Sequence, residues 1–132
     1  MDIVLNGVSV ADLKRQKEQM RESAAKFMAD GIANATTIVR KILDEENTED
    51  VDGLAQEATD ILEQVELVAG ASGMTYYLPY NEEYGEDDSM ANELDNAEHL
   101  EIDWRNKSPV YLLRSRLENM EYDSRMWHSS TC

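Results

Sequence analysis

The sequence has very little cysteine, histidine and proline, and each shortage excludes a class of structure or site. Its one cysteine is Cys132, so no internal disulfide can form, and we expect a cytoplasmic protein. The two histidines, His99 and His128, are too few for the common zinc and di-iron motifs. Two prolines and six glycines in 132 residues do not suggest a low-complexity chain.

Long apolar runs and enzyme motifs are also missing. No run of 18 apolar residues occurs, so no membrane span and no membrane partner are expected. The first residues, MDIVLNGVSV, lack the basic start and the long apolar stretch of a secretory signal. The P-loop, dinucleotide-binding, serine-hydrolase and zinc-protease motifs are absent. A calcium loop centred on Gly53 would place Thr48 and Thr59 where carboxylates are required. We therefore expect a protein that is not an enzyme and holds neither a cofactor nor a metal.

Lysine and arginine are absent from the middle of the chain, although acidic residues are abundant there. Residues 1–43 hold seven Lys/Arg and five Asp/Glu, residues 44–103 hold twenty Asp/Glu and no Lys/Arg, and residues 104–132 hold five Lys/Arg and three Asp/Glu. These segments contribute +2, −20 and +2 to the net charge of −16. A surface that serves only solubility usually mixes both signs. The acidic block of residues 44–103 therefore predicts a functional anionic face, with plain solvation as the alternative.

Apolar residues recur every three or four positions over two long stretches, which is the spacing of amphipathic helices. The first stretch follows Ser9 and runs for roughly 34 residues. The second begins at Thr48, its predicted cap, and ends at Gly70 and Gly73. The short acidic connection between them predicts an antiparallel hairpin whose apolar stripes are both buried. Gly31 lies inside the first helix and predicts a kink or a close contact between helices.

The other segments predict smaller elements. Asn6-Gly7 is the preferred pair for a tight β-hairpin turn, and Pro79 excludes a central strand. Ser89 and Ser108 are predicted to begin helices. The expected fold class is mainly α, an antiparallel long-helix hairpin with additional short C-terminal helices and a small N-terminal β-hairpin, in one acidic domain. Its predicted parts are a β-hairpin over 1–8, the helical hairpin over 9–72, an aromatic and acidic loop over 73–88 and short helices over 89–127.

The acids of the second predicted helix give it nearly the charge density of a nucleic-acid strand. Seven carboxylates lie within the eighteen residues from Glu49 to Glu66. At about 1.5 Å per residue, that is roughly one charge per 4 Å, against one phosphate about every 3.4 Å in a DNA strand. Tyrosines, which often anchor interfaces, accompany the acids that follow. The residues predicted to bind a partner are Glu57, Asp60, Glu63, Glu66, Tyr80, Glu82, Glu83, Tyr84, Glu86, Asp87 and Asp88.

These features predict a non-enzymatic acidic binding protein, an inhibitor or regulator that presents a nucleic-acid-like anionic face to a basic nucleic-acid-binding protein. In type it is similar to small acidic helical proteins, often carried by bacteriophages and plasmids, that disarm host nucleic-acid enzymes by imitating DNA. That resemblance implies action in the host cytoplasm for a phage-encoded protein. Direct binding of nucleic acid is not expected, because the acidic block repels phosphate.

Three further features of the chain carry predictions of their own. The long first helix predicts, as the alternative function, a structural or assembly subunit that oligomerises through this helix, for example as a homodimer. Asp95 and His99 are one helical turn apart and predict a hydrogen-bonded pair on one helix face. A basic cluster on the first helix either pairs with the acidic block within the fold or meets an external anion; its members are Lys14, Arg15, Lys17 and Arg21.

Overall fold

The computed structural model describes residues 4–5, 8–76, 78, 89–100, 105 and 108–130, with side-chain surroundings for residues 10–76, 78, 89–100, 105 and 108–123. Within these ranges the protein is mainly helical, which confirms the predicted class. The elements are β1 (Val4–Leu5), β2 (Val8–Ser9), α1 (Val10–Leu43), α2 (Val51–Ser72), α3 (Met90–Asn96) and α4 (Pro109–Ser130).

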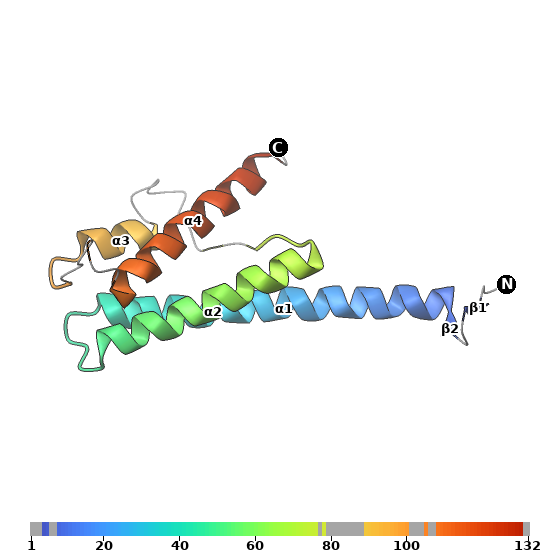
Figure 1. The fold of residues 1–132 in the computed structure, drawn as a ribbon, viewed down its shortest axis with the longest axis horizontal. Coiled ribbons are helices and arrows are strands. Elements are labelled where there is room, and N and C mark those ends of the chain that lie inside the picture. The colour runs from blue at the N-terminus through green and yellow to red at the C-terminus, as the bar shows by residue number, and fades with distance from the viewer. Residues whose placement is uncertain are drawn as a thin grey trace.

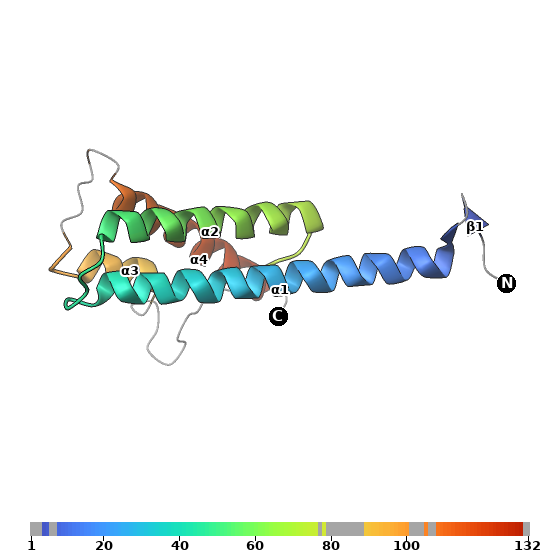
Figure 2. The same cartoon turned by 90° about the horizontal axis from the view of Figure 1, so that it is seen from below.

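The α1 and α2 helices form the hairpin of the fold, and they differ in length. The α1 helix has 34 residues, as predicted, and α2 has 22. Figures 1 and 2 show that α2 runs back along the C-terminal half of α1, while the N-terminal half of α1 projects beyond the end of α2. The structure thus differs from the expectation of two fully buried stripes, because α2 is too short to cover the whole of α1.

The connection between α1 and α2 explains why α2 begins later than predicted. Backbone N–H groups of Glu46 and Glu49 donate to the side chains of Asp44 and Asn47, at 3.0 and 3.1 Å, so these residues form local turns. The cap is therefore not Thr48: Asp50 has extended backbone angles, and its carboxylate accepts a bond from the N–H of Asp52. At the other end, Gly73 adopts a positive φ of 66° after Ser72, which makes Gly73 the terminating glycine, whereas Gly70 lies inside the helix.

The core lies where α2 packs between α1 and α4, with α3 resting against α4 and the end of α1. Gly31 is a point of close approach between α1 and α2, because a Cβ built on it would lie 2.8 Å from a methyl of Val65. The predicted alternatives of a kink or a close contact are thus resolved in favour of the contact. The most deeply buried side chains are Val39 and Ile42 of α1, Leu62 and Val65 of α2, Leu94 of α3, and Leu113, Leu117 and Met120 of α4.

The C-terminal helices are started by the predicted serines. The hydroxyl of Ser89 accepts from the N–H of Asn92 at 3.1 Å, and that of Ser108 accepts from the N–H of Tyr111 at 3.3 Å. The α3 helix ends at Asn96, but α4 continues for 22 residues and is therefore not short. A buried carboxylate, that of Glu121, accepts the N–H of Ala91 and joins α4 to the first turn of α3.

The N-terminal strands make only a minimal ladder. Val4 pairs with Ser9 and Leu5 with Val8 in antiparallel register. The predicted β-hairpin over residues 1–8 is therefore not confirmed, because two strands of two residues each add no layer to the fold and leave the architecture helical. The predicted Asn6-Gly7 turn lies outside the described residues. In the part of the chain that is described, no helix combines the length and apolarity needed to cross a bilayer.

Candidate anionic interface

The predicted binding residues of α2 do not share one face. Glu57, Asp60 and Glu63 are exposed, whereas Glu66 is half-buried. Each step of three residues turns an α-helix by about 300°, so a row spaced by threes drifts about 60° around the helix per step. The row therefore begins on the open side of α2 and ends against α4. Only its first two members, Glu57 and Asp60, lie on the side of α2 that faces away from α4.

Arg116 of α4 neutralises the far end of this row. One guanidinium nitrogen lies 3.2 Å from a carboxylate oxygen of Glu63, and the other lies 3.0 Å from one of Glu66. Arg116 is 53 positions from Glu63 and 50 from Glu66, so no local pattern could have shown the pairing. Two acids of the predicted site thus have a cation within the chain, and their role in binding a partner stays a prediction.

Asp60 and Glu57 differ from Glu63 and Glu66 in that neither pairs with a basic side chain among the described residues. Asp60 accepts one hydrogen bond from the side-chain amide of Gln56 at 2.9 Å, which leaves its charge in place. Among the described side chains, no lysine or arginine forms an ion pair with Glu57 or Asp60. Asp52, in the first turn, is also exposed. These carboxylates adjoin the acidic connection, where Lys41 pairs with Glu49 at 3.7 Å.

A second arginine of α4, Arg114, pairs with one acid of α3 and one of α4. The guanidinium of Arg114 donates from Nε and Nη2 to both oxygens of Asp95, at 2.8 to 3.0 Å, and from Nη1 to Glu118. The hydrogen bond to Asp95 raises the pKa of Arg114, so this cation stays charged at any accessible pH. Asp95 is therefore not the partner of His99, and the predicted pair on one helix face is wrong.

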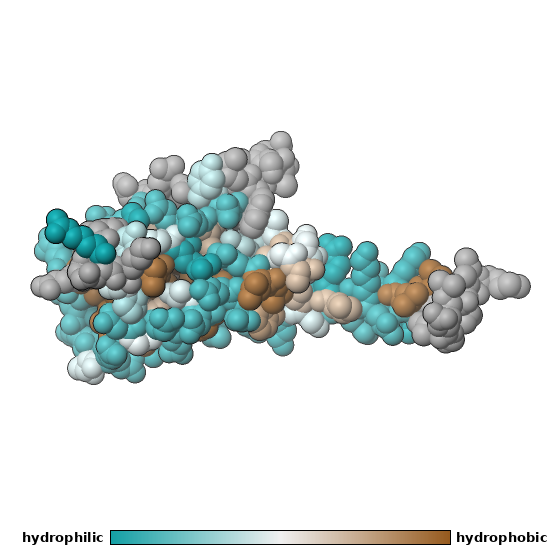
Figure 3. Space-filling view, in the orientation of Figure 1, coloured by the Kyte–Doolittle hydropathy of each residue, from teal (hydrophilic) through white to brown (hydrophobic). Residues whose placement is uncertain are grey.

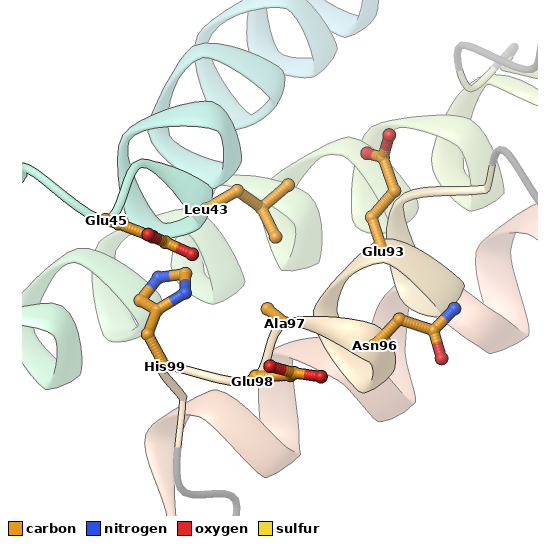
Figure 4. Close-up of a pocket in the computed structure, with 7 residues that line it drawn as sticks. All are labelled: Leu43, Glu45, Glu93, Asn96, Ala97, Glu98 and His99. Atoms are coloured by element: carbon orange, nitrogen blue, oxygen red, sulfur yellow. The ribbon is translucent and has the colours of Figure 1, made fainter.

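His99 instead lies beyond the end of α3 and turns towards α1. Its Nε2 lies 3.0 Å from the carbonyl oxygen of Ile42, so the ring closes the C-terminal end of α1. An open hollow of about 490 Å³ lies beside it. Figure 4 shows Leu43 and Ala97 pointing into the hollow, with the carboxylates of three glutamates around it. They are Glu45, Glu93 and Glu98.

Tyr76, the first tyrosine of the predicted aromatic loop, is a core residue. It is 6% exposed and lines a hollow of about 400 Å³ that Glu66 and Asp123 also border. Burial, with a smaller contribution from Glu66 and Asp123, raises the pKa of its hydroxyl well above the usual value. Its aromatic character therefore serves packing between α2 and α4.

The remaining predicted binding residues lie outside the described part of the chain. Within the described part, no three His, Cys, Asp or Glu side chains are grouped so that they could hold a metal ion. These remaining predicted residues are Tyr80, Glu82, Glu83, Tyr84, Glu86, Asp87 and Asp88.

The carboxylates of α2 and of the connection therefore differ in their surroundings. Glu63 and Glu66 pair with Arg116 of α4, whereas several others are exposed and form no ion pair with a lysine or arginine among the described residues: Asp44, Glu45, Glu46, Asp52, Glu57 and Asp60. An open anionic surface of this kind can bind a cationic partner without chemical catalysis. No protein-family model matches this chain, and no curated protein or solved structure matches it significantly.

Proposed function

We propose that the protein is a non-enzymatic inhibitor or regulator that binds a basic nucleic-acid-binding protein through the acidic end of the helical hairpin. The acidic end consists of exposed carboxylates of the connection and of the first three turns of α2. Its members are Asp44, Glu45, Glu46, Asp52, Glu57 and Asp60.

The observation that carries this proposal is the contrast between Asp60 and Glu63. Both are exposed on α2, one turn apart, but only Glu63 has an arginine. Leaving like charges unpaired on a rigid surface costs stability through mutual repulsion. A cationic groove built for phosphates relieves that repulsion on binding and releases its own anions. The acidic end therefore suits a partner whose ordinary ligand is a nucleic acid.

The test is capture of a partner from a cell lysate at about 50 mM salt, followed by elution in a gradient to about 500 mM. The expected captured protein is basic, binds in a 1:1 ratio, and is displaced by double-stranded DNA or by RNA. Glu57→Gln with Asp60→Asn should lower affinity at least about tenfold, because two unpaired charges are removed. The matched control is Glu63→Gln with Glu66→Gln, which removes charges that Arg116 already offsets. Affinity that stays constant across the salt range would refute the proposal.

A structural or assembly subunit remains the second candidate, and one observation favours it. The N-terminal half of α1 carries exposed apolar side chains that nothing in the described chain covers. Sedimentation velocity at micromolar concentration distinguishes the two: a 15.0 kDa monomer argues against a self-assembling subunit, and a stable multimer supports it.

A further inference from the structure

The projecting half of α1, residues 10–27, is a helix without a neighbour of comparable length. From Ala11 to Phe27 every side chain is exposed except that of Ala24, whereas buried residues recur from Met28 onward. Most helical stability in proteins comes from the packing of an apolar face rather than from helix propensity. This segment therefore stands to gain stability from a helix that packs along it.

One side of the projecting half carries a regular apolar stripe. Leu13, Met20 and Phe27 are seven residues apart and are 43%, 72% and 47% exposed. Ala24 lies between the last two, and apolar colouring recurs along this part of the surface in Figure 3. A seven-residue repeat with an intermediate position is the pattern that packs against one other helix in a coiled coil.

The stripe lies on the side of α1 that packs against α2. A Cβ built on Gly31 would meet Ile61 and Val65 of α2, and Ala24 precedes Gly31 by seven residues. Since seven residues are almost two turns, Ala24 and Gly31 lie on one line along the helix. A helix seated on the stripe would therefore continue the line of α2 past Ser72.

The flank of the stripe is cationic. At heptad spacing, Lys17 falls in the stripe, and Lys14 and Arg21 lie along one edge of it. None of these three forms an ion pair among the described residues, whereas Arg15, on the opposite face, pairs with Asp12 at 3.8 Å. The other edge, with Gln16 and Ser23, is neutral.

We propose that the projecting half of α1 binds an acidic amphipathic helix of a different protein, forming a two-helix coiled coil. The partner's apolar positions would cover Leu13, Met20 and Phe27, and its Asp or Glu flank would meet Lys14, Lys17 and Arg21. This surface and its charge differ from those of the acidic end, so the inference stands independently of the proposed function.

A second copy of this chain fits the stripe less well. A parallel pair would set Lys17 against its own counterpart, and an antiparallel pair would set Lys14 near Arg21, and both are repulsive. The rest of the described surface offers no second stripe, because its large exposed apolar residues are the scattered Leu67, Leu112 and Tyr122. A lipid surface fits poorly too, since interfacial helices need a wide apolar face and this stripe has one large side chain per two turns.

The test uses the full chain and two synthetic peptides of three heptads, both with leucine at the apolar positions. One carries glutamate on its flanks and the other lysine. Titration calorimetry should show the glutamate peptide binding at least about tenfold more tightly, and circular dichroism should show the helix content rising on mixing. Met20→Ser should abolish binding, and Lys17→Glu with Arg21→Glu should reverse the preference between the peptides.

Matched variants control for folding and for general charge. Met20 is highly exposed, so Met20→Ser should retain the fold, and Leu67→Ser removes an exposed leucine elsewhere. Lys26→Glu changes a charge on the side of α1 away from the stripe. Equal binding of the two peptides, or binding that Met20→Ser leaves intact, would overturn the proposal. So would a dimer in sedimentation that Met20→Ser dissociates, or Met20-dependent binding to vesicles with about 30% anionic lipid, because each identifies another occupant.

Discussion

Replacing Gly31 by alanine should destabilise the protein, although alanine is the better helix former. In a solvent-exposed helix interior this change gains about 1 kcal/mol. At Gly31 the new Cβ would lie 2.8 Å from Cγ2 of Val65, whereas carbon atoms pack best at about 3.5–4.0 Å. Val65 is fully buried and β-branched, so its methyl cannot rotate away freely. Overpacking of this kind costs about 1–3 kcal/mol, which leaves a net loss of up to about 2 kcal/mol.

Gly70 provides the matched control in the partner helix. It lies inside α2, and a Cβ built on it would meet nothing within 4 Å. Gly70→Ala should therefore stabilise by up to about 1 kcal/mol. For a chain of this size each kcal/mol shifts the melting temperature by roughly 3–6 °C, so thermal unfolding should separate the two variants with opposite signs.

A double-mutant cycle with Val65→Ala identifies the cause. Once the Val65 methyls are removed, Gly31→Ala should become stabilising, because only the propensity gain remains. If Gly31→Ala raises the melting temperature in the unaltered chain, α1 and α2 do not approach as closely as described, and the reasoning about their packing fails.

Three further outcomes are expected. Arg116→Gln should lower the free energy of unfolding by only about 0.5–1 kcal/mol, since Arg116, Glu63 and Glu66 are all partly exposed. The same change frees Glu63 and Glu66, so the salt dependence of partner binding should become steeper; a shallower dependence contradicts this. Asp50→Ala should lower stability by about 1 kcal/mol in urea unfolding through loss of the α2 cap, and Asp44→Ala, outside the helix, should cost less. Because burial raises the pKa of Tyr76 in the folded state, the unfolded chain loses that proton first as the pH rises. The free energy of unfolding should therefore be constant below about pH 10 and fall above it. Denaturant titrations of Tyr76→Phe should show a smaller fall.

The helices were predictable from sequence because local rules decide them. The repeat of apolar residues in 10–43 and 51–72, and the hydroxyls of Ser89 and Ser108, act over three or four positions. The start of α2 was misassigned because Asp44 and Asn47 both form side-chain turns, which moves the cap from Thr48 to Asp50. Several suitable cap residues in a row cannot be ranked without knowing where the chain turns.

The charge pairing within the candidate site could not be predicted from sequence, because it depends on distant segments. Glu63 and Glu66 are paired because α4 packs on α2, which brings Arg116 beside them. Likewise, the apolar stripe of α1 looks continuous in sequence from Leu13 to Ile42, and only the length of α2 reveals that its first half is uncovered. The first half of the stripe also differs from the second half in its flanking residues, because Lys14 and Arg21 border it.

The projecting half of α1 and the acidic end lie at opposite extremities of an elongated molecule (Figure 2). Residues 10–27 hold five basic and three acidic side chains, while the far extremity is strongly negative. Such a separation makes the protein an electric dipole along its long axis. A charged body approaching it through solution exerts a torque before any contact, so each extremity is turned towards the sign it attracts. Encounters are thus pre-oriented, and added salt should slow association at both extremities.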